Sequence, residues 1–206
     1  MITVWGRASS SNVQKVVWTL DELGVEYERI DRGREFGGLD TPEYLANNPN
    51  GRVPTVQDGD LVMWESQPIC RYLARTYSGE ALLPADPSAA FEVEKWMDWN
   101  VAHLAPSMFP MFLAAREADD LAVAKDAKFE RLVSEARRLL GIMEETLSGQ
   151  AYLAGNSFTL ADLVCAVSAS RWLFVGHDFG DNQSVAAWYA RVSERPAAQR
   201  HNVVSF

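Results

Sequence analysis

The β-prone runs of this 206-residue chain lie only in its first third, and this asymmetry constrains the fold more than any other feature. Short runs rich in β-branched and aromatic residues occur at residues 2–5, 25–30, 55–57 and 61–64. Beyond residue 87, apolar residues recur only at helical spacing. The sequence therefore predicts an α+β unit followed by an all-helical unit.

The first two strands and the segment between them predict a βαβ unit. Apolar residues recur at helical spacing from Val13 to Leu23, and Gly24 predicts the end of that helix. Because the runs 2–5 and 25–30 flank this helix, we expect them to be parallel neighbours.

Two further signals complete the first unit. Thr41-Pro42 is typical of an N-cap with proline at the first helical position, and this short helix should end near Asn47. Asp58-Gly59-Asp60 separates two β-prone runs and predicts a hairpin. Helical spacing resumes at Glu65, so the predicted order is β-α-β-α-β-β-α.

The segment 77–87 contains Ser, Gly and Pro and has no sustained periodicity, which indicates a linker. We therefore expect one domain at residues 1–80 and a second, all-helical bundle at residues 88–206.

Three patterns mark helices in the second domain. One runs through residues 96–112, where Pro106 and Pro110 should kink it, and another covers residues 129–147. The stretch 158–163 begins a third, because it places Thr159 at an N-cap and Asp162 three residues later as a capping box. We assign this capping box a folding role and no catalytic one.

Charge and composition exclude several functions. The net charge of −9 and the pI near 4.8 disfavour nucleic acid and anionic membranes, which need clustered Lys and Arg. No stretch approaches the roughly 18 apolar residues of a membrane-spanning helix. The N-terminal apolar run is too short for a signal peptide. The two cysteines, Cys70 and Cys165, lie far apart in helical patterns, so we expect a soluble, cytoplasmic protein.

Several features together resemble the glutathione transferase family. They are the order of elements, the Val53-Pro54 dipeptide before the hairpin, the Glu65-Ser66 pair at the next helix start, the capping box and the helical second half. The stretch Ser10–Val16 is similar to bacterial, theta-like members that use serine. The resemblance covers essentially the whole chain.

The resemblance implies a thioredoxin-like first domain that binds glutathione and a helical second domain that holds an electrophile. It implies glutathione as co-substrate with no permanently bound cofactor. It also implies a homodimer, with no nucleic-acid or membrane partner. Neither cysteine lies in the loop after the first strand, which disfavours mixed-disulfide chemistry.

The resemblance also assigns residues to glutathione. It implies that Pro54 follows a cis peptide bond, so that the backbone of Val53 pairs with the cysteinyl part. At the helix start, Ser66 would bind the γ-glutamyl carboxylate and Glu65 would face the α-ammonium, although simple capping also explains both residues. Near the glycyl end lie Asn50 and Arg52, with Arg34 and Gln67 as other candidates.

The catalytic group must stabilise a thiolate, because a thiol with a pKa near 8.5 is only about 3% ionised at pH 7. Ser10 matches the family serine. Ser11, Asn12 and Ser9 are alternatives, because they lie close to Ser10 in the chain. Helix capping without a catalytic role explains three of these four residues. Arg7 either adds positive potential or is an ordinary surface arginine.

The electrophile is expected near Trp5 and a stripe formed by Met108, Phe109 and Phe112, although such a stripe is more often core. Trp172 is a further possible wall. His103 has no second ligand at metal-binding spacing, so no metal is expected.

These residues predict an enzyme that activates the thiol of glutathione and transfers it to small electrophiles, for example halogenated ones. Two alternatives stay open. One is a transferase-like binding or regulatory module without turnover, since fold alone does not establish function. The other is a glutathione-dependent dehalogenase, lyase or peroxidase, because all of these reactions begin with the same thiolate.

Overall fold

The computed structural model describes residues 1–117 and 127–201. The chain forms two compact units, Met1–Ala85 and Asp86–Phe206, so the boundary lies inside the predicted linker 77–87. Within the described residues, no helix is both long enough and apolar enough to cross a membrane.

The second domain was predicted at residues 88–206. Of these, residues 118–126 and 202–206 lie outside the described ranges.

The first unit contains a four-stranded mixed sheet in the order β2-β1-β3-β4. As predicted, β1 is parallel to β2, and β3 and β4 form a hairpin. The hairpin joins β1 in antiparallel fashion through β3. The bounds are β1 (Ile2–Trp5), β2 (Tyr27–Ile30), β3 (Thr55–Asp58) and β4 (Leu61–Trp64).

The second strand is shorter than predicted. It begins at Tyr27 because Tyr27 is the residue paired with Ile2, the first residue of β1. Val25 and Glu26 therefore have no strand residue opposite them, and the β-prone pattern at 25–30 overestimated the strand by two residues.

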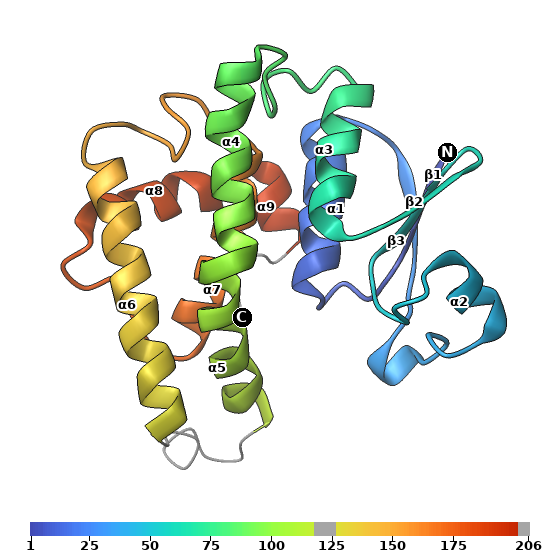
Figure 1. Ribbon diagram of the computed structural model, residues 1–206, viewed down its shortest axis with the longest axis horizontal. Coiled ribbons are helices and arrows are strands. Elements are labelled where there is room, and N and C mark those ends of the chain that lie inside the picture. Colours follow the sequence, from blue (N-terminus) through green and yellow to red (C-terminus); the bar gives the residue numbers. More distant parts are fainter. Residues whose placement is uncertain (118–126, 202–206) are drawn as a thin grey trace. The chain divides into compact units, whose positions relative to one another are not determined.

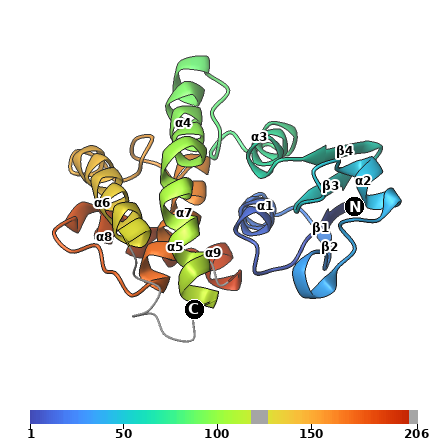
Figure 2. The ribbon, with the colours of Figure 1, turned by 60° about the horizontal axis from the view of Figure 1, so that its bottom comes forward.

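Three α-helices complete the first unit: α1 (Ser11–Glu22), α2 (Pro42–Asn47) and α3 (Ser66–Thr76). Both α1 and α3 lie on one side of the sheet and α2 lies on the other (Figures 1 and 2). A 3₁₀-helix at Arg34–Phe36, which the sequence did not predict, lies between Gly33 and Gly37.

The periodicity of α1 explains its burial and its end. Val13, Val16 and Leu20 have no exposed surface and face the interior of the first unit. Gly24 ends the helix with φ of +65°, which glycine adopts at little cost. The N–H groups of Gly24 and Val25 donate to the carbonyls of Asp21 and Leu20, so the last turn keeps its hydrogen bonds.

The second unit is helical throughout its described residues. The long helix α6 (Ala127–Leu147) runs antiparallel to the helices α4 (Pro87–Trp99) and α5 (Ala105–Glu117), as Figure 1 shows. The elements are α4 (Pro87–Trp99), a π-helical segment η2 (Asn100–Leu104), α5 (Ala105–Glu117), α6 (Ala127–Leu147), α7 (Leu160–Phe174), α8 (Gln183–Ser193) and α9 (Pro196–Arg200).

We expected Pro106 and Pro110 to kink the helix through residues 96–112, and the structure shows a π-helical segment before them. Regular α-helical bonding gives way to the π-helical segment at 100–104, which ends two residues before Pro106. Proline has no N–H to donate, so a local change in bonding pattern accommodates it. Pro110 lies inside α5.

The core of the second unit is α7, which is buried over most of its length. Asp162 is fully buried at its first turn and accepts four hydrogen bonds, from the N–H and hydroxyl of Thr159, the N–H of Leu153 and the indole N–H of Trp188, at 2.8 to 3.1 Å. Burial raises the pKa of Asp162, and these four donors oppose that rise. The carboxylate thus ties α7 to α8 and to the segment before it.

Replacing Asp162 with alanine should lower the free energy of unfolding by about 3 kcal/mol or more, because it leaves buried donors without an acceptor. Urea unfolding followed by circular dichroism measures this. Asp181→Ala, at an exposed position of the same unit, is the matched control and should change stability by less than about 0.5 kcal/mol. Equal stability of the two variants would contradict this account of α7.

Candidate functional site

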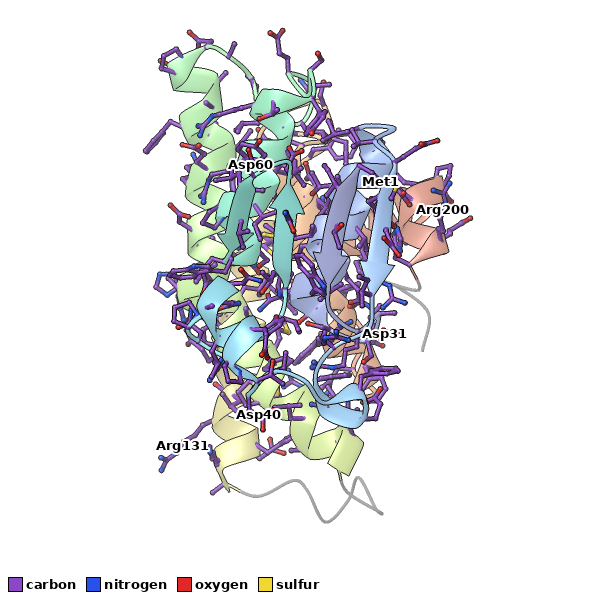
Figure 3. The ribbon with its side chains drawn as sticks, turned by 90° about the vertical axis from the view of Figure 1, so that its right-hand side faces the viewer. Met1, Asp31, Asp40, Asp60, Arg131 and Arg200 are labelled. Atoms are coloured by element: carbon purple, nitrogen blue, oxygen red, sulfur yellow. The ribbon has the colours of Figure 1, made fainter. Side chains whose placement is uncertain are left out.

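A single row of paired residues places the candidate site at one end of the sheet. Trp5 pairs with Ile30 on one side and with Thr55 on the other, and Thr55 pairs with Trp64. Strands β1, β2 and β4 end at this row, and β3 begins there. Figure 3 shows the two ends: Met1 and Asp60 lie at one, and Asp31 lies at the other.

Four connecting segments therefore leave the sheet at the same end. They are residues 6–10 after β1, residues 31–34 after β2, residues 53–54 before β3 and residues 65–66 after β4. Each of these four segments contains a residue that the sequence singled out for glutathione or for catalysis: Ser10, Arg34, Val53 and Ser66.

The first segment approaches the third very closely. A Cβ atom on Gly6 would lie 2.4 Å from Cγ2 of Val13 and 3.1 Å from Cβ of Val53. Only glycine fits between the start of α1 and the Val53 segment.

Ser10 is the N-cap residue of α1, and its carbonyl accepts from the N–H of Gln14 at 2.8 Å. Its side chain makes no capping hydrogen bond and is 8% exposed. No acidic residue lies in the first turn of α1. The start of this helix, with its positive dipole end, is thus open to an anion.

The alternatives to Ser10 have different surroundings. Ser9 is exposed and Ser11 is half-buried. The side-chain oxygen of Asn12 already accepts two hydrogen bonds, from Nζ of Lys15 at 3.2 Å and from Oγ of Ser66 at 3.3 Å. The contact with Ser66 joins α1 to α3, so the structure brings the Ser10 segment and the Glu65-Ser66 pair together.

The Val53 segment is held by a buried network centred on Asn48. Its Nδ2 donates to the carbonyl of Arg52 at 2.8 Å and to the hydroxyl of Thr55 at 3.1 Å, and its Oδ1 accepts from the N–H of Asn50 at 3.1 Å. The hydroxyl of Tyr44 donates to the same Arg52 carbonyl at 2.7 Å. The chain before β3 is therefore fixed from both sides.

The Val53–Pro54 peptide bond is cis, which confirms the sequence expectation. Arg52 and Asn50 are exposed at the edge of this segment. The side-chain amide of Asn50 is directed back to Asn48, to whose Oδ1 it donates at 3.2 Å.

The helix start after β4 has an unusual backbone. Glu65, the N-cap residue of α3, is exposed and has φ of +72°, a value uncommon for a residue with a side chain. Ser66 is 4% exposed. No acidic residue and no side-chain cap occupies the first turn of α3, so its free N–H groups can also receive an anion.

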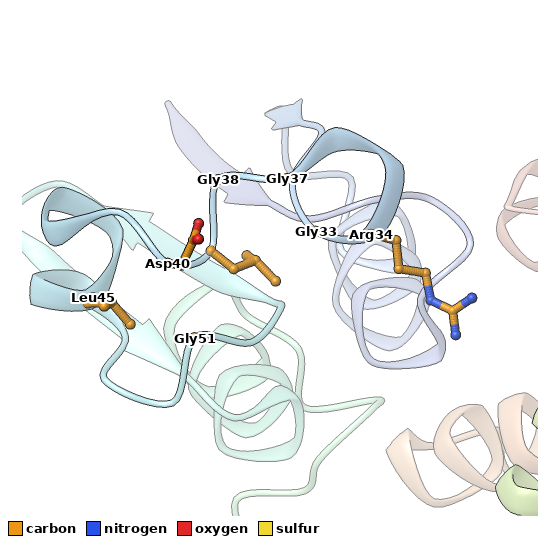
Figure 4. Close-up of a pocket in the computed structure, with 8 residues that line it drawn as sticks. Gly33, Arg34, Gly37, Gly38, Asp40, Leu45 and Gly51 are labelled. Atoms are coloured by element: carbon orange, nitrogen blue, oxygen red, sulfur yellow. The ribbon is translucent and has the colours of Figure 1, made fainter.

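A pocket of about 320 Å³ opens next to the Val53 segment (Figure 4). Four of its eight lining residues are glycines, and Asp40 supplies a carboxylate. The lining residues are Gly33, Arg34, Gly37, Gly38, Leu39, Asp40, Leu45 and Gly51.

The residues suggested for an electrophile do not gather in one unit. Trp5 lies in the first unit, whereas Met108, Phe109 and Phe112 lie in the second. Met108 and Phe112 are buried, and Phe112 contacts Phe174 edge-on at 4.7 Å between ring centroids. Phe109 is 39% exposed. The electrophile-binding role of these residues stays a prediction.

Cys70, in α3, is poorly suited to thiol chemistry. Burial raises the pKa of the Cys70 thiol to about 11, so this cysteine is protonated and unreactive at neutral pH. Across residues 1–117 and 127–201, no three His, Cys, Asp or Glu side chains are grouped so that they could hold a metal ion.

The first unit and most of the second match known domain families. Residues 1–75 match the glutathione S-transferase N-terminal domain, and residues 100–196 match the C-terminal domain. The chain belongs to the glutathione S-transferase family. The family predicted from the sequence is therefore confirmed, together with a thioredoxin-like unit followed by a helical one.

Individual members of the family are similar over nearly the full length. Glutathione S-transferase GstB of Escherichia coli is 36% identical, with 97% of each chain covered. Glutathione S-transferase 3 of Zea mays is 34% identical, with 97% of this chain and 92% of the relative covered. The solved theta class glutathione S-transferase of Xanthomonas axonopodis pv. citri, with glutathione bound, has a TM-score of 0.90 and 39% identity, covering 97% of this chain and 96% of that one.

Within this transferase fold, sequence reasoning missed Asn48 and Lys15. Asn48 lies in a stretch that reads as an ordinary Asn- and Pro-rich loop, and only its burial of 98% identifies it as structural. Lys15 lies on the side of α1 away from the apolar stripe, where a lysine is expected to be exposed, yet it is 4% exposed and donates to Asn12. No local sequence pattern signalled the burial of Lys15.

Asn48→Ala should lower the free energy of unfolding of the first unit by about 2 to 3 kcal/mol, because it leaves the Arg52 carbonyl and the Asn50 N–H short of partners. Asn47→Ala, at the exposed end of α2, is the control and should stay within about 0.5 kcal/mol of the unchanged protein. Urea unfolding compares the two, and a stable Asn48→Ala protein would show that other groups hold the Val53 segment.

Proposed function

We propose that this glutathione transferase binds glutathione across the end of the sheet where residues 6–10, 53–54 and 65–66 meet, and that Ser10 stabilises the thiolate. The observation that carries this assignment is the unused Ser10 hydroxyl at the start of α1, a few residues from the Asn12–Ser66 contact. The thiolate then attacks a small electrophile, and the protein needs no permanently bound cofactor.

The γ-glutamyl end is assigned to the start of α3. The free N–H groups there favour its carboxylate, and the exposed Glu65 is available for its α-ammonium. The Ser66 hydroxyl donates to Asn12 in the structure, so it would exchange that acceptor for the carboxylate. Lys15 would still donate to the released Asn12 oxygen.

The cysteinyl part is assigned to the backbone of Val53, which lies against Gly6 at the start of the Ser10 segment. The glycyl end then reaches the exposed residues Asn50 and Arg52. Arg52 suits a carboxylate because guanidinium pairs with it in a bidentate manner. The neighbouring pocket presents Asp40, so a carboxylate is better placed at Arg52 than deeper inside it.

The benefit of Ser10 can be stated as a free energy. A hydrogen bond to a charged acceptor contributes about 1.5–3 kcal/mol, and each pKa unit corresponds to about 1.4 kcal/mol. One hydroxyl can therefore lower the thiol pKa by about one to two units. That shift raises the thiolate fraction at pH 7 from about 3% to roughly a quarter or more.

Two variants should separate binding from thiolate stabilisation. Ser10→Ala should bind glutathione with near-normal affinity in calorimetric titration at pH 7.5, while turnover of an alkyl halide falls about 5- to 10-fold, as the thiolate fraction does. Ser66→Ala should instead weaken glutathione binding about 10-fold and leave kcat nearly unchanged, because it alters only the γ-glutamyl end.

Ser11→Ala is the matched control for the first variant. If it abolishes turnover while Ser10→Ala does not, the thiolate role moves to Ser11 and the rest of the site assignment stands. If the unchanged protein binds no glutathione, the proposed function is wrong.

We further propose that the protein acts as a homodimer in the cytoplasm. Both described cysteines are free and buried, as suits a reducing compartment. Trp64 on the edge strand β4 and Phe91 on α4 are 44% and 63% exposed in the single chain, which favours a covered state. Light scattering at micromolar concentration should give twice the 23.0 kDa chain mass, and a mass of one chain would contradict the dimer.

A further inference from the structure

The backbone of Arg7 links two of the four segments at the candidate site, its own segment 6–10 and the segment 31–34. Its N–H donates to the carbonyl of Arg32 at 3.2 Å, just past the end of β2. Its own carbonyl accepts from the N–H of Ser10 at 3.1 Å. The position of Arg7 is therefore tied to the serine that we assign to the thiolate.

The guanidinium of Arg7 occupies space that only a glycine leaves free. Nη1 of Arg7 lies 3.1 Å from the place where a Cβ atom of Gly33 would stand, and Leu39 approaches the same point to 2.9 Å. Nε of Arg7 is buried and has no hydrogen-bond partner within the described part of the chain. A buried N–H of this kind is costly unless another molecule accepts from it.

A second arginine adds to the positive charge. Arg34 is exposed and has φ of +51°, an uncommon backbone conformation for an arginine. Its side chain extends away from Asp40 and Leu45, as Figure 4 shows, so it does not neutralise the pocket carboxylate. Burial lowers the pKa of Arg7 and the charge of Arg34 lowers it further, while Glu35 opposes the shift to a smaller degree.

We propose that Arg7 and Arg34 form an anion site for the second substrate, so that this transferase favours electrophiles that carry a carboxylate. The inference deepens the proposed function and rests on it. Both carboxylates of glutathione are already assigned elsewhere, the γ-glutamyl one to Ser66 and the glycyl one to Arg52. The positive charges of Arg7 and Arg34 are therefore available to a carboxylate on the electrophile. Arg7 belongs to the segment that presents the thiolate.

The reaction itself balances without any further reactant. The thiolate sulfur attacks the carbon that bears a halide, a carbon–sulfur bond forms as the carbon–halogen bond breaks, and halide ion leaves. The proton of the thiol is released to water when the thiolate forms. The arginine pair takes no part in these bonds and only orients the carboxylate.

Two substrates matched in reactivity test the proposal: 4-(bromomethyl)benzoate and 4-(bromomethyl)benzamide. Bromide release is measured with the unchanged protein and with the variants Arg7→Gln, Arg34→Gln and Arg75→Gln, after subtraction of the uncatalysed rate. Arg75 is exposed on the last turn of α3, so its variant removes the same charge from the same unit.

We expect the unchanged protein to favour the benzoate in kcat/KM. Arg7→Gln and Arg34→Gln should each lower this preference about 10-fold or more, and Arg75→Gln should leave it intact. Turnover of the benzamide reports that each variant is folded and active. An equal loss on both substrates, or no preference in the unchanged protein, overturns the anion site and leaves the proposed function standing.

A comparison of glutathione with its glycyl ethyl ester tests whether Arg7 binds the glycyl carboxylate of glutathione instead of the carboxylate of the electrophile. The ester lacks the glycyl carboxylate. If Arg7→Gln raises KM for glutathione but not for the ester, the pair binds the glycyl carboxylate and the proposal is wrong. If the unchanged protein converts neither bromomethyl substrate with glutathione, the proposed function and the anion site both fall.

Discussion

The pairing of Trp5 with Thr55, and of Thr55 with Trp64, is the constraint on which the rest of the site depends. It sets the ends of three strands in one row, so the segments that follow or precede them must meet. Because side chains alternate along a strand, a slip by one residue would turn each strand over and expose the buried residues Val4 and Val56. The register that buries the core therefore also assembles the site.

Hydrogen bonds from side chains then fix the segments that the sheet brings together. Asn48 supports the chain before β3, and Asn12 joins the start of α1 to Ser66 at the start of α3. Neither helix has an acidic residue in its first turn, and the free N–H groups at both helix starts favour negative charge. The thiolate and the γ-glutamyl carboxylate of glutathione are the two anions that we assign to them.

The sequence predicts the helices and strands well but the contacts between them poorly, because secondary structure leaves local patterns and long-range contacts do not. Periodicity and caps are local, so α1, the hairpin and the capping box at Thr159 were found before the structure was known. The start of β2 was wrong because it depends on its partner strand. The fit of the Arg7 guanidinium against Gly33 likewise joins positions distant in sequence. Such contacts leave no local pattern to read.

The most direct test of the account is an NMR titration of the ¹⁵N-labelled protein with S-methylglutathione, which binds without reacting. We predict that the amide signals that shift most belong to the non-proline residues of 6–13, 53–55 and 65–69, at the row of strand ends. Unchanged signals in all three segments, with shifts confined to the helical unit, would contradict the account.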